Sequence, residues 1–275
     1  MSDQQSKYLR FKALHEGKQA FVIPNPWDAG SAKLLASLGF EALATTSAGF
    51  AFSQGHIDSF SSDDRDTVLR NAAEIVQATR LPVSADLANG FGHTPEACAE
   101  TIRLASQVGL VGGSIEDATG DAAKPIYDMS LAVERVLAAA EAAKNLPFLL
   151  TARAENFLWE RPDLDDTIKR LQAFAAAGAD VLYAPGLPDL DAIRTVCSAV
   201  DKPVNVVMGL KGPVFSVAEL ADAGVSRISV GGSFARAALG GLMRAAQEVK
   251  TTGTFTYAAE ALPGKVIAGI MAQEP

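Results

Sequence analysis

Short apolar runs of strand length recur along the chain and alternate with longer segments in which apolar residues return every three or four positions. The period of the longer segments predicts amphipathic helices at 64–79, 95–108, 131–144 and 164–177. The short runs predict eight strands, at 21–25, 42–46, 82–87, 113–116, 148–152, 181–184, 203–207 and 227–230. Apolar strands that alternate with helices are typical of a parallel sheet with helices on both faces.

The regular spacing of these elements favours a closed barrel. Successive predicted strands begin about 29 residues apart, which is the length of one strand–helix unit. Several predicted helices end at a glycine, as at Gly109 and Gly178, where a left-handed cap costs least. A doubly wound sheet would instead carry a glycine-rich phosphate turn after its first strand, and residues 24–28 read Pro-Asn-Pro-Trp-Asp. We therefore expect an α/β fold of the (β/α)₈ TIM-barrel type.

The length of 275 residues fits one such barrel. We expect a single domain over 1–275, with the barrel core at about 20–250 and a C-terminal helical tail at about 251–275. The tail contains an apolar stretch, 266–271, for which a complete barrel has little use. Subunit packing is its plausible role, so we expect a homo-oligomer, either a dimer or a tetramer.

Composition excludes several classes of protein. Hydrophobic residues make up 48% and charged residues 20%, as in ordinary globular proteins and unlike disordered or fibrous ones. The net charge is −8 and no basic stripe is present, so we expect no nucleic-acid partner. The polar N-terminus and the lack of a long apolar run predict neither a signal peptide nor a membrane partner. Cys98 and Cys197 stand in apolar stretches and are interpreted as reduced thiols, so we expect a cytoplasmic protein.

Polar residues stand where the predicted strands end, at the edge where barrels place their active sites. So many carboxylates at one mouth would require a cation or protons to offset their charge. The five acids are Asp28, Asp86, Glu116, Asp117 and Glu155. The other polar residues at these ends are Asn25, Thr45, Thr46, Ser47, Asn89, Arg153, Asn156, Tyr183, Asn205 and Ser229.

The kinds of side chain at the strand ends favour a hard metal ion. No His or Cys stands among them, so zinc and iron are poorly supported, whereas carboxylate oxygens suit Mg²⁺ or Mn²⁺. Asp86 and Glu116 are the favoured ligands because each ends an otherwise apolar strand. Asp28 precedes Ala-Gly-Ser-Ala and is better interpreted as a helix N-cap. Asp117 fits a site role and a loop-holding role equally.

Arg153 and two small-residue segments leave alternatives open. The guanidinium of Arg153 suits a clamp on a substrate carboxylate or phosphonate, and it equally suits a structural pair with Glu155 or another acid. Backbone N–H groups of 44–49 are placed to face an anion. The segment 231–233 after the last strand fits either a phosphate site or close packing.

The histidines contribute little to these hypotheses. His15 and His93 are interpreted as surface or capping residues. His56 lies near Asp58 in the loop after the second strand, where a titrating role is weakly indicated.

The ordered motifs resemble the isocitrate lyase/phosphoenolpyruvate mutase superfamily. The likeness runs from about 21 to 249 and combines an Asp…Gly-aromatic-Gly block (86–92) with Ile-Glu-Asp (115–117) and Ala-Arg-x-Glu (152–155). The segments 25–32 and 45–49 add to it. Three further positions depart from the superfamily pattern. Ala88 stands where a second acid is usual, the loop 118–125 lacks the Cys and His of the isocitrate and methylisocitrate lyases, and Gly186 lies near where those lyases have a Glu.

The resemblance implies a (β/α)₈ barrel, often a tetramer whose C-terminal helices are exchanged between subunits. It implies Mg²⁺ near Asp86 and Glu116, and a 2-oxo acid chelating that metal. By the same resemblance, Thr46, Ser47 and Ala48 match the carboxylate-holding segment, Arg153 the substrate-binding arginine and Asp58 the acid of a gating loop. We accordingly expect catalytic roles for Arg153, Asp58 and Glu116. The expected substrate-binding residues are Thr46, Ser47, Ala48, Arg153 and Asn205.

These expectations lead to a Mg²⁺-dependent (or Mn²⁺-dependent) carbon–carbon lyase. It would cleave a small 2-oxo or 2-hydroxy (di)carboxylate through a metal-stabilised enolate, as an oxaloacetate decarboxylase does. The alternatives are carbon–phosphorus chemistry of the phosphoenolpyruvate mutase or phosphonopyruvate hydrolase type, and an isocitrate or methylisocitrate type of lyase. A barrel that binds a carboxylate without turning it over is a third alternative.

Overall fold

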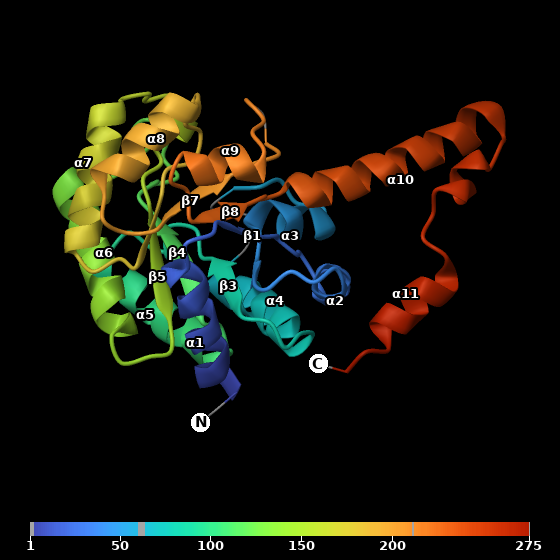
Figure 1. Ribbon diagram of the computed structural model, residues 1–275, viewed down its shortest axis with the longest axis horizontal. Coiled ribbons are helices and arrows are strands. Elements are labelled where there is room, and N and C mark those ends of the chain that lie inside the picture. Colours follow the sequence, from blue (N-terminus) through green and yellow to red (C-terminus); the bar gives the residue numbers. More distant parts are fainter. Residues whose placement is uncertain (1–2, 60–63, 211, 275) are drawn as a thin grey trace.

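Eight parallel strands form the centre of the protein. The computed structural model describes residues 3–59, 64–210 and 212–274 (Figure 1). The strands follow the order β1-β8-β7-β6-β5-β4-β3-β2 around the sheet. Their bounds are β1 Phe21–Ile23, β2 Leu43–Ala44, β3 Val83–Asp86, β4 Gly112–Glu116, β5 Leu149–Arg153, β6 Val181–Tyr183, β7 Val204–Val207 and β8 Arg227–Ser229.

Hydrogen bonds between β1 and β2 bring the two ends of the sheet together. The backbone N of Ala44 donates to the carbonyl of Pro24 at 3.0 Å, just past β1. The Asn25 side chain donates to the carbonyl of Thr45 and accepts from the backbone N atoms of Val230 and Gly231. One amide therefore ties together the carboxyl ends of β1, β2 and β8. The predicted (β/α)₈ barrel is confirmed, and every strand lies at its predicted place with each end within two residues of the prediction.

Helices surround this barrel, and N-cap side chains mark where several of them begin. The four predicted amphipathic helices are confirmed to within two residues at each end. Their starts at α4, α5 and α7 carry Asp64, Thr94 and Asp163, whose side chains accept the exposed backbone N–H of the first turn. The helices around the sheet are α1 Asp3–Glu16, α2 Ala29–Ser37, α3 Ser47–Ser53, α4 Arg65–Gln77, α5 Pro95–Gln107, α6 Met129–Ala143, α7 Leu164–Ala176, α8 Leu190–Ala199, α9 Val217–Asp222 and the short 3₁₀ helix η1 Asn156–Trp159.

The main apolar core lies between the outer faces of the strands and these helices. Leu43, Ile115, Leu150 and Phe174 are fully or almost fully buried there. A second, smaller cluster closes the amino-terminal end of the barrel, where α1 covers the strands. His15 of α1 is packed edge-on against Phe21 in that end, with only 7% of its surface exposed. The interpretation of His15 as a surface or capping residue is therefore wrong, because α1 packs across the amino-terminal end of the barrel and buries this side chain.

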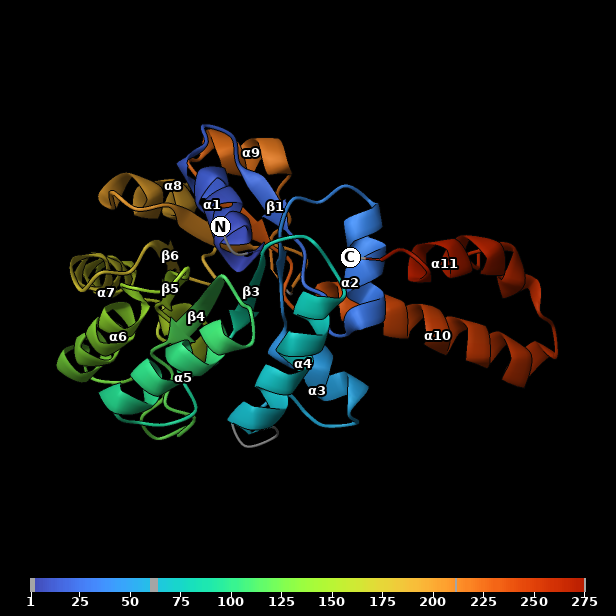
Figure 2. The ribbon, with the colours of Figure 1, turned by 90° about the horizontal axis from the view of Figure 1, so that it is seen from below.

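The last part of the chain extends away from the barrel. Helix α10 (Ser233–Thr252) leaves the sheet, the 3₁₀ helix η2 (Thr256–Ala259) turns the chain, and α11 (Gly264–Met271) runs back toward α2 (Figure 2). Lys33 of α2 donates to the carbonyls of Met271 and Gln273 at 2.7 and 2.9 Å. No helix in the described part of the chain is both long and apolar enough to cross a membrane.

Both cysteines are free thiols. Cys98 is completely buried on α5 and Cys197 is half-buried on α8. Burial raises the pKa of each thiol, and for Cys197 the pKa reaches about 11. The thiols are therefore protonated near neutral pH, as expected of packing residues.

Candidate active site

A cavity of about 750 Å³ opens at the carboxyl ends of β3, β4 and β5. This is the end of a barrel where side chains from several strands converge. The loop 118–125 after β4 contributes Thr119, Gly120 and Asp121 to its wall. The other residues that line it are Ser47, Asp58, Ser59, Asp86, Ala88, His93, Glu116, Arg153, Glu155, Leu158 and Trp159.

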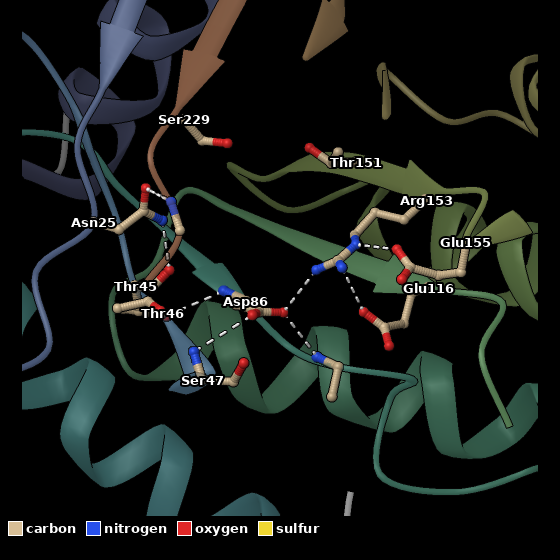
Figure 3. Close-up of polar contacts among 12 residues, drawn as sticks. Asn25, Thr45, Thr46, Ser47, Asp86, Glu116, Thr151, Arg153, Glu155 and Ser229 are labelled. Carbon is tan, nitrogen blue, oxygen red and sulfur yellow. Dashed lines mark hydrogen bonds and ion pairs between the residues drawn. The ribbon is translucent and has the colours of Figure 1, made fainter. Parts of the chain in front are cut away.

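Arg153 at the end of β5 lies among three carboxylates (Figure 3). Its Nη1 is 3.3 Å from Asp86 Oδ1, its Nη2 is 3.0 Å from Glu116 Oε2, and its Nε donates to Glu155 Oε1 at 2.8 Å. The guanidinium plane also faces the Tyr183 ring, with Cζ 4.9 Å from the ring centroid. The register explains the meeting, because Glu116, Arg153 and Tyr183 are partners on adjacent strands. The structural pair with Glu155 is thus present, and it extends to two further acids.

The cluster has more negative than positive charge. Three ionised carboxylates around one guanidinium would leave an excess of two negative charges. Burial raises the pKa of Glu116 well above its usual range, and Arg153 only partly offsets this. Burial likewise raises the pKa of Glu155. Burial lowers the pKa of Arg153, but Glu116, Glu155 and Asp86 raise it further, so its net pKa lies well above the usual value. The cluster therefore needs a cation or protons.

The loop after β3 places Asp86 at the cavity. The Asp86 carboxylate accepts from the backbone N of Ser47 at 3.4 Å and from that of Ala88 at 3.3 Å. The Asp86 backbone N donates to Thr45 Oγ1 at 3.1 Å. Ala88 has a left-handed backbone (φ 47°), and its carbonyl accepts from the backbone N of Glu116 at 3.0 Å. Asp86 and Glu116 are thus positioned by one continuous set of backbone hydrogen bonds.

The donor set fits Mg²⁺ held by few protein ligands. Within the described ranges, no group of three or more His, Cys, Asp or Glu side chains forms a ready-made metal cage. Mg²⁺ commonly keeps several waters and takes only one or two carboxylates. Asp86 and Glu116 supply two carboxylates on neighbouring strands, inside a cluster with excess negative charge. A methyl group occupies the Ala88 position, so water or substrate oxygens would have to complete the coordination.

Two of the five acids expected at the mouth have other roles. Asp28 accepts from the backbone N of Ser31 at 2.6 Å and caps α2 in a capping box, so the preferred N-cap interpretation is confirmed. Asp117 is buried, where its carboxylate accepts from the backbone N of Glu155 at 2.8 Å and pairs with Arg170 at 3.0 Å. Burial raises its pKa to about 6. The expected convergence of five carboxylates on one mouth is therefore wrong for Asp28 and Asp117.

The remaining predicted residues divide between the cavity wall and structural duties. Thr46 Oγ1 accepts from the backbone N of Gly49 and caps α3. A smaller cavity of about 230 Å³ continues into the barrel and is lined by all five expected substrate-binding residues, Thr46, Ser47, Ala48, Arg153 and Asn205. Ser47, Asp58, Asp86 and Arg153 line both cavities. Asn205 is buried inside the barrel, where its amide donates to Ser229 and accepts from Arg227.

The segment 231–233 packs closely against α3. A side chain at Gly232 would begin 3.0 Å from the Ala48 Cβ. The backbone N of Gly231 is already bonded to Asn25. The packing interpretation of this segment therefore explains it better than a phosphate site.

Sequence reasoning missed three buried arginines, Arg135, Arg170 and Arg227. Arg227 lies inside the barrel at the start of β8, and Arg135 of α6 donates to the carbonyls of Asn89 and Gly92 beside the cavity. A basic residue within a predicted strand, flanked by Ser226 and Ile228, was a signal available for Arg227. Arg135 carried no such signal, because arginine on an amphipathic helix is ordinarily exposed.

Comparison with known proteins identifies the family. A sequence model of the phosphoenolpyruvate phosphomutase family matches residues 11–250, which is most of the chain. The chain belongs to this family. The resemblance to the isocitrate lyase/phosphoenolpyruvate mutase superfamily, and with it the expected lyase-type enzyme class, is thereby confirmed.

Relatives of this phosphoenolpyruvate phosphomutase family member include lyases. A 2-methylisocitrate lyase of Shewanella oneidensis is 28% identical over 232 residues, covering 82% of this chain and 78% of that one. An oxaloacetate decarboxylase of Ectopseudomonas mendocina is 26% identical over 202 residues, covering 72% and 68%. Among solved structures, a candidate lyase/mutase from Burkholderia cenocepacia has a TM-score of 0.96 at 58% identity, covering 99% of this chain and 98% of that one.

Proposed function

We propose that the protein is a Mg²⁺-dependent carbon–carbon lyase acting on a small 2-oxo or 2-hydroxy (di)carboxylate, in the manner of an oxaloacetate decarboxylase. The observation that carries this proposal is the cluster of Asp86, Glu116 and Glu155 around Arg153 in a cavity at the carboxyl end of the barrel. The carbon–carbon lyases and decarboxylases among its relatives support it.

Asp86 and Glu116 would hold the metal, with Mn²⁺ as a substitute for Mg²⁺. The bound ion supplies Lewis-acid stabilisation of the negative charge that develops on an enolate oxygen, a contribution worth several kcal/mol. The chain itself orients Asp86 through the backbone N–H groups of Ser47 and Ala88, and the carbonyl of Ala88 accepts from the backbone N of Glu116. Ligands that are held in advance need no rearrangement when the charge develops.

Arg153 would orient the substrate from the centre of the cluster. Glu155 fixes its Nε, and stacking on Tyr183 fixes the plane of the guanidinium. Holding a substrate carboxylate at a fixed angle keeps the breaking bond aligned with the carbonyl π system. Asp58, on the loop that lines both cavities, is the acid we assign to proton transfer.

The loop after β4 favours a small substrate over a tricarboxylate. Thr119, Gly120 and Asp121 of this loop line the cavity, and the loop contains neither Cys nor His. A tricarboxylate lyase of the isocitrate type would place its proton donor there, as the superfamily resemblance implies. Decarboxylation or cleavage of a small 2-oxo acid requires only charge stabilisation and a proton from water or a loop acid.

Turnover of three substrates tests the proposal. We expect purified protein with Mg²⁺ to release pyruvate and CO₂ from oxaloacetate, and EDTA to abolish the release. Release of phosphate from phosphonopyruvate, or of products from methylisocitrate alone, would replace the proposal with the corresponding alternative. Metal-dependent binding of all three compounds without turnover would indicate a non-catalytic barrel.

A matched pair of variants tests the site assignment. Asp86→Asn is expected to lower kcat/KM roughly 100-fold or more, because it removes charge from the ligand set. Asp28→Asn is the control, since asparagine also caps helices and Asp28 lies outside the cavity. Equal activity of the two variants would show that Asp86 is not in the site.

We also propose that the tail assembles subunits into a dimer or tetramer. Leu242, Met243 and Phe255 are each about two-thirds exposed on α10 and the turn that follows it. Apolar side chains so exposed on an arm that leaves the barrel indicate a surface covered by a second copy of the chain.

A further inference from the structure

The inner wall of the barrel is polar where many barrels are filled with branched aliphatic side chains. Ser84, Ser114 and Ser229 point into the 230 Å³ cavity from β3, β4 and β8. This volume lies below the roughly 300 Å³ of drug-sized pockets. The cavity can therefore hold a small polar group.

Arg227 forms the floor of this cavity. It pairs in register with Phe21, the first residue of β1, so it lies at the amino-terminal end of the barrel, opposite the mouth. Only 6% of its surface is exposed, and it is among the residues that line the cavity. The side chain of a neighbouring strand residue, Asn205, accepts from its Nε at 2.8 Å.

Among the described residues, the hydrogen-bond partners of the Arg227 side chain are neutral. Besides Asn205 Oδ1, they are Thr151 Oγ1 at 3.1 Å and His15 Nε2 at 3.3 Å. In the described part of the chain, Arg227 takes part in none of the ion pairs, whereas Arg153 pairs with three acids. A guanidinium has five N–H donors, so two of those of Arg227 are not used by these three bonds.

The charge of Arg227 persists in this setting. Burial lowers its pKa, and the nearby Tyr183 offsets this only in part, so that the pKa is about 10. The group is therefore protonated at neutral pH. A buried cation without a counter-ion is costly, and an anion in the adjoining cavity would offset that cost.

We propose that this cavity is a carboxylate-binding site, with Arg227 as its cation and the serine hydroxyls of the inner wall as additional donors. The same cavity is also lined by Asp58, Asp86, Arg153 and Arg236, and the proposed site is its amino-terminal end, where Arg227 lies. The carboxylate comes either from the far end of the substrate or from a separate small acid. The first source rests on the proposed lyase function, and the second does not.

Calorimetric titration with acetate and malonate tests the proposal on the full-length protein in EDTA, without metal or turnover. We expect the wild type to bind malonate, Arg227→Met to weaken binding about 10-fold or more, and Arg227→Lys to retain most of it because the charge remains. Arg194→Met, at an exposed pair on α8, is the matched control and should bind as the wild type does. Binding of neither probe by the wild type, or equal binding by wild type and Arg227→Met, would overturn the proposal.

A second variant and a competition titration complete the test. If Arg227→Met does not fold, Ser114→Val fills the cavity while keeping the arginine, and undiminished malonate binding in this variant would also overturn the proposal. Titration of acetate into protein saturated with pyruvate or with 2-oxoglutarate separates the sources. Exclusion of acetate by 2-oxoglutarate but not by pyruvate indicates the far end of a substrate, and binding of acetate alongside both indicates a separate small acid. Because no turnover is measured, failure of the lyase assay leaves this result unaffected.

Discussion

At the residue scale, His15 is held as a neutral imidazole between a backbone carbonyl and a cation. Its Nδ1 lies 2.8 Å from the Phe11 carbonyl and its Nε2 lies 3.3 Å from Arg227 Nη1. Since the carbonyl only accepts and the guanidinium only donates, Nδ1 carries the proton and Nε2 accepts. Burial, and then the charge of Arg227, lower the pKa of His15 to about 3.

This histidine should make the protein sensitive to mild acid. The unfolded chain binds a proton at His15 below about pH 6.5, whereas the folded chain does not until about pH 3. The contribution of the neutral His15 to the free energy of unfolding is therefore complete above pH 6.5. It falls by about 1.4 kcal/mol for each pH unit between pH 6.5 and pH 3. His15→Gln, which does not titrate, should lose less stability than the wild type between pH 7 and pH 5 in urea unfolding. Parallel losses in both proteins would show that His15 is not the responsible group.

Sequence reasoning located residues whose role follows from their position on a strand. Asp86, Glu116 and Arg153 end parallel strands, and the carboxyl ends of such strands necessarily meet. The role of His15 could not be read in this way, because α1 is polar over most of its length and its pattern does not reveal which face covers the barrel. Arg227 escaped notice because charged side chains are rarely buried without a charged partner.

At the element scale, the loop 87–92 between β3 and α5 depends on one distant side chain. Ala88, Gly90 and Phe91 all have left-handed backbones, and for Ala88 and Phe91 this conformation is strained. Arg135 of α6, 1% exposed, donates to the carbonyl of Gly92 at 2.7 Å and to that of Asn89. Its Cζ also lies 4.2 Å from the Tyr127 ring centroid. The conformation that positions Asp86 is thus held in place from a neighbouring helix.

Loss of Arg135 should loosen the loop. Arg135→Met removes two charge-assisted bonds of about 1.5–3 kcal/mol each, so we expect the free energy of unfolding to fall by about 3 kcal/mol or more. Faster hydrogen–deuterium exchange across 87–92 and a lower affinity for Mg²⁺ should accompany it. Glu134→Ala, an exposed position on the same helix, is the control. Unchanged exchange across 87–92 in Arg135→Met would contradict this role.

Helices and strands could be predicted because each has its own period, and the helices also have their own caps. Asp64, Thr94 and Asp163 mark helix starts within the sequence itself. The conformation of the loop 87–92 is instead set by Arg135, more than forty residues away, and no local pattern contains that information. Helix α3 is likewise not predicted, since the sequence indicates only an anion-facing segment at 44–49 and the seven small and aromatic residues of the helix show too little period to define it.

At the scale of the whole molecule, the barrel and the arm have different kinds of surface. Helix α10 has a single buried residue, Ala235, and α11 has none, although both helices are amphipathic. Contacts with α2, including those of Lys33, connect the end of the arm to the barrel. An apolar face that the chain leaves uncovered on such an arm is consistent with the proposed assembly of subunits.

Assembly through the C-terminal arm (α10, η2 and α11) predicts that the protein in solution has a multiple of the monomer mass. The full-length chain, 28.7 kDa as a monomer, should run at two or four times that mass in light scattering after gel filtration. A Leu242→Asp/Met243→Asp double variant should shift to the monomer, because it places charge in a desolvated interface. Leu137→Asp replaces an equally apolar, 44% exposed residue on α6, on the opposite side of the barrel, and should leave the mass unchanged (Figure 1). A monomeric wild type would contradict the assembly proposal.

The polar inner wall determines which amino-acid substitutions the barrel should tolerate. The apolar core that stabilises the fold lies outside the strands, against the helices, whereas Ser84, Ser114 and Ser229 contribute hydroxyls to a partly hollow interior. Small residues beside a cavity can be enlarged without the overpacking that a close-packed core would suffer. The free energy of folding therefore comes mainly from the outer faces of the strands, while the small inner-face residues border the cavity. Ser84 and Ser114 are therefore the inner-face positions most open to redesign, whereas Asn205, Arg227 and Ser229 on the same face are buried and joined by hydrogen bonds.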